Sequence, residues 1–298
     1  MQLVEYTNKH NIDDILNQAD QLCKAFDSSS NCYDYLKEKL TNTNCKTYNL
    51  MDSQYNVHGI AIIEILDTLY GNLILHTLLE SDEAKLADLM VPNIKGHVLE
   101  LIQFRSNFTY RDTFIHNGLK EKERARMIHS DIGIYAEIHP MPNVTFHQLK
   151  SKSDLIHSGE ISYQAHKHRQ HIECYDAYNS AEKRTQFATD LRSGKHGKGI
   201  DEASLLMSYD GQAVGVIDVV EVPYKDEKIG WIMDISVLPE FQGIGLGQQL
   251  IKQSLSNAYY AGYSKIGLGV TLTNKGAYQL YQHLGFEDYE IFVEILSR

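Results

Sequence analysis

The chain has 298 residues, of which 43% are hydrophobic and 22% charged, and its formal net charge is -11. This is the composition of a globular protein with room for two domains of ordinary size. The negative charge argues against nucleic-acid binding, which needs clustered Lys and Arg, and no apolar run reaches the eighteen residues of a membrane span. The first residues contain neither a basic leader nor an apolar signal core, so we expect a cytoplasmic protein.

The cysteines are spread along the chain without a CxxC pair, at Cys23, Cys32, Cys45 and Cys174. In a reducing compartment, cysteines at such spacings are expected to be free thiols and not a disulfide framework.

The first half of the chain is expected to form one α+β domain. Strand-like runs cover Leu73–Leu79, His97–Phe104 and the region around Arg126–Ile138. No glycine occurs from Asn72 to Lys95, and the first run continues into Glu80-Ser81-Asp82-Glu83. This half ends at His139-Pro140-Met141-Pro142-Asn143, where two prolines predict a stiff connector. We therefore expect domains at 1–140 and 141–298.

The second half begins with the signals of an antiparallel sheet. A strand is predicted over Val144–Leu149, and Ser153 is expected to cap a helix after it. Asp210-Gly211 separates two apolar runs, which is a strong hairpin signal because both turn residues must accept a positive φ. A third strand is predicted over Trp231–Val237. Beyond it the pattern predicts a helix, a strand, a helix and a strand, over Leu246–Ala258, Ile266–Leu272, Asn274–Leu284 and Tyr289–Leu296.

A glycine-rich loop connects the third strand to the next helix. Its sequence is Gln242-Gly243-Ile244-Gly245-Leu246-Gly247. Glycine lets a backbone approach a ligand closely, and a helix N-terminus offers unpaired N–H groups and the positive end of the helix dipole. Together these features predict a diphosphate site. The spacing does not fit GxxxxGK[ST], and the preceding antiparallel hairpin does not fit a dinucleotide-binding fingerprint.

The pattern Gln242-x-x-Gly245-x-Gly247 resembles the pyrophosphate loop of the GNAT superfamily of N-acetyltransferases. Downstream, Asn274-x-x-Ala277-x-x-Leu280-Tyr281-x-x-x-Gly285-Phe286 is similar to the second cofactor motif of that family. The resemblance covers residues 144 to 298. It implies an α+β fold with a mixed, largely antiparallel sheet flanked by helices, and acetyl-CoA as the acyl donor.

The resemblance implies a role for each matching position. The backbone of Ile235, Ser236 and Val237 would hold the acetyl and pantetheine end of acetyl-CoA. Asn274 would contact the pantetheine arm. The pyrophosphate would be bound by the loop Gln242, Gly243, Ile244, Gly245, Leu246, Gly247 and Gln248.

The resemblance also points to the proton-transfer groups. Tyr281 would protonate the departing thiolate, although on its apolar helix face it could equally be a core tyrosine. Some family members use a glutamate as the general base, and the two positions where it occurs are Gly269 and Trp231 in this sequence. Asp234, on the same strand as Trp231, is the candidate general base, and a strand-edge carboxylate bonded to backbone is the alternative.

A group of histidines precedes the last cysteine, with His168, His171 and Cys174 three residues apart and His166 just before them. Side chains at this spacing drift round a helix without converging on one ion, so we predict no metal site. A role for one of the histidines beside the acceptor is the better interpretation, because this region flanks the amine channel in the family.

The first half contains the same anchors as the second, 167 residues earlier. Asn107, Phe114 and Gly118 correspond to Asn274, Tyr281 and Gly285. A repeated unit explains this pattern, and an unrelated α+β domain is the alternative. The first copy lacks the glycine loop, has carboxylates in its place and has phenylalanine at the tyrosine position. We therefore expect tandem GNAT-like domains, of which the first is degenerate and does not bind the cofactor.

The sequence therefore predicts an N-acetyltransferase that moves an acetyl group from acetyl-CoA to a primary amine in a ternary complex. The acceptor would be a small molecule or a peptide, and the chain is compatible with a homodimer. A sensor of the same fold that binds CoA or an amine without turnover is the alternative.

Overall fold

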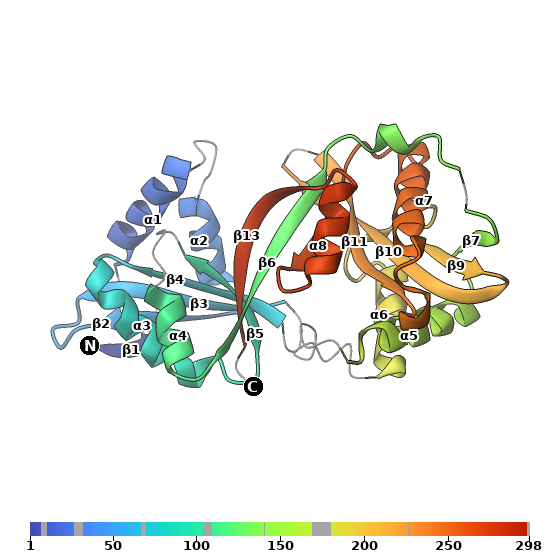
Figure 1. Cartoon of the computed structure of the whole chain (residues 1–298). Coiled ribbons are helices and arrows are strands. Elements are labelled where there is room, and N and C mark those ends of the chain that lie inside the picture. The colour runs from blue at the N-terminus through green and yellow to red at the C-terminus, as the bar shows by residue number, and fades with distance from the viewer. Residues whose placement is uncertain are drawn as a thin grey trace. The chain divides into compact units, whose positions relative to one another are not determined.

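The computed structural model describes residues 1–6, 11–26, 32–66, 70–103, 109–139, 141–168, 180–225 and 227–296. The chain forms two compact units, one of Met1–Lys122 with Phe292–Arg298 and one of Glu123–Ile291 (Figure 1). This division differs from the expected boundary at residue 140. Across the described segments, no helix has the length and apolar character needed to cross a membrane.

The first unit has a sheet with two pairs of helices. Its elements in chain order are β1 (Gln2–Glu5), α1 (Asp13–Phe26), α2 (Cys32–Thr41), β2 (Cys45–Met51), β3 (Val57–Ile65), β4 (Tyr70–Thr77), α3 (Glu83–Met90), β5 (Val98–Gln103) and α4 (Thr109–His116). The strand order is β1-β2-β3-β4-β5, and only β4 and β5 are parallel. Alternate residues of β3 face opposite sides: Ile60 and Ile62 pack against α1 and α2, whereas Ala61 and Ile63 pack with α3 and α4.

From β7 onward the second unit repeats this order, with one added short strand, β8. Its elements are β6 (Lys120–His129), β7 (Val144–Gln148), α5 (Lys152–His166), α6 (Ala181–Arg192), β8 (Lys198–Gly199), β9 (Leu205–Tyr209), β10 (Gln212–Tyr224), β11 (Glu227–Val237), α7 (Leu246–Tyr260), β12 (Ile266–Thr271), α8 (Lys275–His283) and β13 (Glu287–Leu296). The strand order is β6-β12-β11-β10-β9-β7, and only β11 and β12 are parallel. The expected α+β fold is therefore confirmed.

The cap of α5 lies two residues before the expected one. Ser151 has an extended backbone, and its hydroxyl accepts from the backbone N–H of Asp154, whose carboxylate accepts in return from the N–H of Ser151. This reciprocal capping box satisfies two donors at the helix start. Ser153, expected as the cap, is the second residue of the helix.

The ends of α4 and α8 support the predicted repeat. Gly118 and Gly285 have φ values of 82° and 85°, in the left-handed region that glycine favours at a helix end. The N–H of the next residue returns to the helix in both units, from Leu119 to the carbonyl of Phe114 and from Phe286 to that of Tyr281. The third anchor, Asn107, lies outside the described residues.

The last strand of each repeat completes the sheet of the other unit. In the first unit, Val293–Leu296 of β13 pairs antiparallel with β5. In the second unit, residues 124–129 of β6 pair antiparallel with β12. This exchange explains why the compact units do not follow the expected boundary at 140.

The expectation of free thiols is wrong for two cysteines. Cys23 in α1 and Cys32 in α2 form a disulfide with a Cα–Cα distance of 6.4 Å. Both cysteines pack against the apolar cluster between these helices and the sheet. This packing brings the two thiols together although they are nine positions apart in the sequence. Cys45 is a free thiol, and burial raises its pKa. Cys174 lies outside the described residues.

Reduction of the Cys23–Cys32 disulfide should lower the free energy of unfolding by about 2–3 kcal/mol, because the bridge removes loop-closure entropy from the unfolded chain. Urea titrations with and without a reductant measure this difference. A Cys45→Ser variant should keep it, whereas a variant with serine at both bridged positions should not respond to reductant. Equal stability of the oxidised and reduced protein would contradict the prediction.

Candidate functional site

The parallel strands β11 and β12 part in the middle of the second unit. Their paired residues end at Ile232 opposite Leu268, whereas β11 continues to Val237 and β12 to Thr271. Met233, the next residue of β11, has no partner on β10 and forms a β-bulge. Backbone groups on this side of β11 after the bulge are therefore available to a ligand that enters between the strands.

The glycine loop follows directly from the separated end of β11. The Gln242 side chain donates from Nε2 to the carbonyl of Val237 at 2.7 Å, which ties the loop to the strand. Gly243 and Gly245 have φ values of 80° and 89°, so both need the conformational freedom of glycine. Residues 242–245 are exposed to solvent.

The loop delivers the N-terminus of α7 to the same place. Gly245 is the cap residue, and within the described chain no side chain bonds to the N–H groups of the first turn. A Cβ added to Gly247 would lie no closer than 3.9 Å to any neighbour, so a ligand can approach the backbone there. The remaining predicted loop and strand residues vary in exposure, with Ile244 exposed, Ile235 and Gln248 half-buried, and Ser236, Val237 and Leu246 buried.

Helix α8 carries the other predicted residues. Asn274 begins the helix, and its backbone N–H donates to the carbonyl of Thr271 at 2.8 Å. Tyr281 is buried, with its ring centroid 6.0 Å from that of Phe286. Tyr278, half-buried about one turn earlier on the same helix, donates from its hydroxyl to Asp288.

Asp234 lies in a buried ionic network on the face of the sheet covered by α5 and α6. Its carboxylate pairs with the Arg184 guanidinium at 2.6 Å and accepts from the Ser236 hydroxyl at 3.2 Å. The His166 ring lies 3.0 Å from the same hydroxyl. Burial opposes ionisation, but Arg184 and His166 outweigh it and hold the pKa of Asp234 below its ordinary value. Such a carboxylate is a weak proton acceptor, which disfavours the expected base role.

A second buried carboxylate faces Asp234 from β10. Asp218 is its cross-strand neighbour and pairs with Arg192 at 3.0 Å. Burial raises the pKa of Asp218 to about 6, which Arg192 opposes and the Asp234 charge reinforces. The two arginines stand eight residues apart on α6. Their sequence pattern did not predict this role, because a two-turn spacing of arginines occurs on many solvent-exposed helices.

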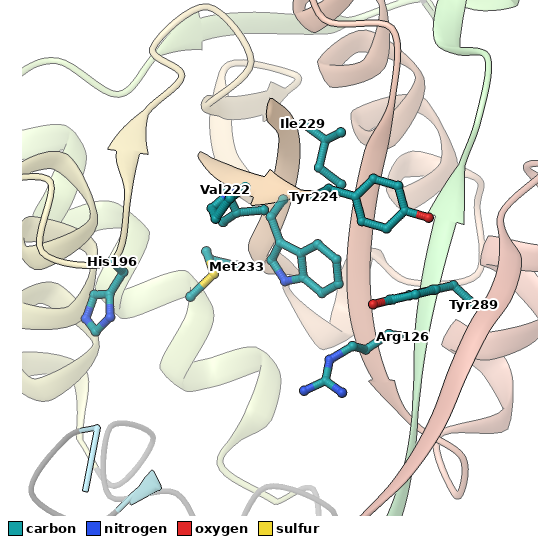
Figure 2. Close-up of a pocket in the computed structure, with 9 residues that line it drawn as sticks. Arg126, His196, Val222, Tyr224, Ile229, Met233 and Tyr289 are labelled. Atoms are coloured by element: carbon teal, nitrogen blue, oxygen red, sulfur yellow. The ribbon is translucent and has the colours of Figure 1, made fainter. Parts of the chain in front are cut away.

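A pocket of about 390 Å³ opens beside the bulge (Figure 2). It is lined by Arg126, His196, Val222, Pro223, Tyr224, Ile229, Trp231, Met233 and Tyr289. The resemblance would place glutamates at the positions of Trp231 and Gly269, and here both positions have close neighbours. The Trp231 ring lies over Gly267, at which an added Cβ would come within 2.4 Å of it, and a Cβ on Gly269 would come within 3.2 Å of Arg124.

The histidine cluster is only partly described. His166 ends α5 and His168 is exposed in the turn after it, whereas His171 and Cys174 lie outside the described residues. Among the residues that are described, no group of three potential ligands is placed to hold a metal ion.

Part of the second unit is similar to a known protein family. Residues 168–286 match the acetyltransferase (GNAT) family. A stretch of 64 residues is 38% identical to an uncharacterized N-acetyltransferase from Methanocaldococcus jannaschii; it covers 22% of this chain and 28% of that protein.

Solved structures match over nearly the whole chain. A GCN5-related N-acetyltransferase from Sphaerobacter thermophilus is 12% identical with a TM-score of 0.60, and the match covers 98% of this chain and 94% of that one. A tandem GNAT protein from the clavulanic acid biosynthesis pathway is 13% identical with a TM-score of 0.50, over 99% and 97% of the two chains. At these identities the matches concern the fold, and they confirm its tandem GNAT-like character.

The free energy of unfolding should depend on pH through Asp218. Its pKa is raised from 3.8 to about 6, so between these values the folded protein binds a proton that the unfolded chain releases, and stability falls as pH rises. An Asp218→Asn variant cannot ionise. Relative to the unmodified protein it should gain about 1–3 kcal/mol between pH 4 and pH 7, measured by urea titration. A difference that does not change with pH would contradict the prediction.

Proposed function

We propose that this protein transfers an acetyl group from acetyl-CoA to a primary amine, because residues 168–286 match the acetyltransferase (GNAT) family. The carrying observation is the open glycine loop at the start of α7, beside the point where β11 leaves β12. The loop offers the two features that a CoA diphosphate needs, which are uncapped N–H groups and the positive end of a helix dipole. The parted strands offer backbone to the pantetheine arm.

Different residues bind different parts of acetyl-CoA in this proposal. Amides from Gly243 to Gln248 bind the pyrophosphate, with Gln242 holding the loop against Val237. The backbone of residues 235–237 binds the acetyl and pantetheine end, and Asn274 contacts the pantetheine arm from the start of α8.

The reaction is direct transfer within a ternary complex. The amine nitrogen attacks the thioester carbonyl carbon of acetyl-CoA and the C–N bond forms as the C–S bond breaks. The nitrogen loses its proton to water, and the thiolate gains one. A backbone N–H near Val237 stabilises the oxyanion that develops on the carbonyl oxygen. Tyr281 protonates the thiolate from its buried position on α8. Asp234 is already paired with Arg184, so it receives no proton-transfer role.

The first unit does not bind acetyl-CoA in this proposal. At the place that corresponds to the glycine loop, β4 leads into a short 3-10 turn at Glu80–Asp82 and then into α3. Carboxylates at this position repel a diphosphate. Phe114, the counterpart of Tyr281, has no proton to give.

A sensor that binds CoA or an amine without turnover is the second candidate. Two observations favour it: Gly269 and Trp231 occupy the positions of the family's glutamates, and the Asp234 carboxylate is paired. Release of CoA with any amine would exclude the sensor.

A Gly247→Asp variant should lose acetyl-CoA binding and keep its fold. The structure has room for the aspartate side chain, and a negative charge in the first turn stabilises a helix. The carboxylate would, however, repel the diphosphate of acetyl-CoA. Calorimetric titration should give one site per unmodified chain and at least a tenfold weaker affinity for the variant. Ser153→Asp, an exposed change at the same position of α5, is the matched control. Two sites per chain, or unchanged affinity in the Gly247→Asp variant, would refute the proposed site.

A Tyr281→Phe variant should bind acetyl-CoA normally and turn over at least a hundredfold more slowly, because it removes the general acid and leaves the ring in place. Tyr278→Phe is the control, since Tyr278 lies on the same helix and bonds to Asp288. Steady-state release of CoA at saturating amine measures both. Equal rates for the two variants would show that Tyr281 is a core residue and no more.

A further inference from the structure

The pocket beside the bulge has an apolar wall formed by the β10–β11 hairpin. Val222 and Tyr224 come from β10, and Ile229 and Trp231 come from β11. In Figure 2 Met233 and His196 lie on one side of the pocket, and Tyr224 and Tyr289 lie on the other. This wall can bury a flat or branched apolar group.

Trp231 is seated in the wall by its neighbour on β12. The side-chain position of Gly267 is filled by the indole, since an added Cβ would lie 2.4 Å from one ring carbon and 2.5 Å from another. A glycine on β12 therefore makes room for the tryptophan on β11. The pair lies one position before the last parallel pair, Ile232 opposite Leu268, so the pocket lies beside the place where the acyl donor would enter.

The polar side chains that line the pocket can all donate a hydrogen bond. Arg126 contributes a guanidinium, Trp231 an indole N–H, and Tyr224 and Tyr289 a hydroxyl each, and His196 lies at the opposite side. Of the described residues that line the pocket, none is an aspartate or a glutamate. This balance suits an anionic group, and it opposes a ligand with several positive charges.

Arg126 pairs with Glu290 at 2.5 Å, and the two side chains are 25% and 43% exposed. A partly exposed pair of this kind contributes at most about 1 kcal/mol. A ligand carboxylate, held by the planar fork of the guanidinium, can therefore replace Glu290 at little cost.

We propose that this pocket binds the amine acceptor, and that the acceptor carries a carboxylate and an apolar body, as an apolar α-amino acid does. The inference rests on the proposed acetyl transfer. Arg126 holds the carboxylate, and the wall around Trp231 holds the apolar body. The amine is left toward Met233 and the gap between β11 and β12, where the acetyl group would be presented.

The test compares L-phenylalanine with L-phenylalaninamide and spermidine as acceptors of the full-length protein. We expect L-phenylalanine to be acetylated and spermidine to be the poorest of the three. An Arg126→Gln variant should lower kcat/KM for L-phenylalanine by about tenfold to a hundredfold relative to kcat/KM for the amide. The change in the acid-to-amide ratio between the two proteins is the decisive quantity, because it cancels the intrinsic difference between the two amines.

Two further variants control for charge and geometry. Lys228→Gln removes a cation that is 72% exposed on β11 and paired with Glu221, so it should leave the ratio unchanged. Arg126→Lys keeps the charge but loses the fork, so its ratio should lie between those of the unmodified protein and the Arg126→Gln variant. Retained acetyl-CoA affinity and thermal midpoint show that each variant is folded.

Calorimetric binding of L-phenylalanine in the presence of CoA separates this inference from the proposed reaction. Binding that depends on Arg126 without turnover of any amine would refute acetyl transfer and support the pocket. Turnover of spermidine in preference to L-phenylalanine would support acetyl transfer and overturn the inference. An unchanged ratio in the Arg126→Gln variant, or no binding and no turnover of L-phenylalanine, would also overturn it.

Discussion

The second unit depends on the separation of two parallel strands that begin as neighbours. Strands β11 and β12 pair only as far as Ile232 and Leu268, and the bulge at Met233 turns the rest of β11 away. Backbone groups that leave the ladder need other hydrogen-bonding partners, and a ligand between the strands would supply them. The glycine loop and the first turn of α7 follow from the end of the same strand, so one departure from regular pairing creates each part of the proposed acyl-donor site.

The two faces of this sheet carry different kinds of interaction. Helices α7 and α8 cover a continuous apolar cluster to which Leu250 and Tyr281 belong. The face toward α5 and α6 contains the paired carboxylates of Asp218 and Asp234 with two arginines. Removing charges from water costs free energy that pairing only partly offsets, so this network is not by itself evidence of added stability. Met233, the extra residue of the bulge in β11, lines the pocket.

Much of the fold could be predicted from local sequence because its signals are local. Glycines at 243 and 245 need a left-handed backbone, Asp210-Gly211 makes a tight hairpin, and the spacing from Phe114 to Gly118 repeats that from Tyr281 to Gly285. Residue roles in acetyl-CoA binding stay predictions, since they come from the family resemblance. Contacts between residues far apart in the sequence have no such local signal. The pattern of a strand does not say which strand it will pair with, so the exchange of β6 and β13 was missed, and the Cys23–Cys32 bridge depends on how two helices pack. The partner of Asp234 was missed for the same reason.

Because the repeats exchange their final strands, the first sheet cannot be completed until the second repeat has been synthesised. A ribosome makes β5 long before it makes β13, so the first sheet keeps an open edge at β5 through the whole synthesis of the second repeat. Open strand edges pair readily with other chains, which makes this interval the period of greatest exposure to aggregation or to chaperones. The same arrangement restricts evolution by gene fission, because a cut between the repeats would leave each half with a strand that belongs to the other.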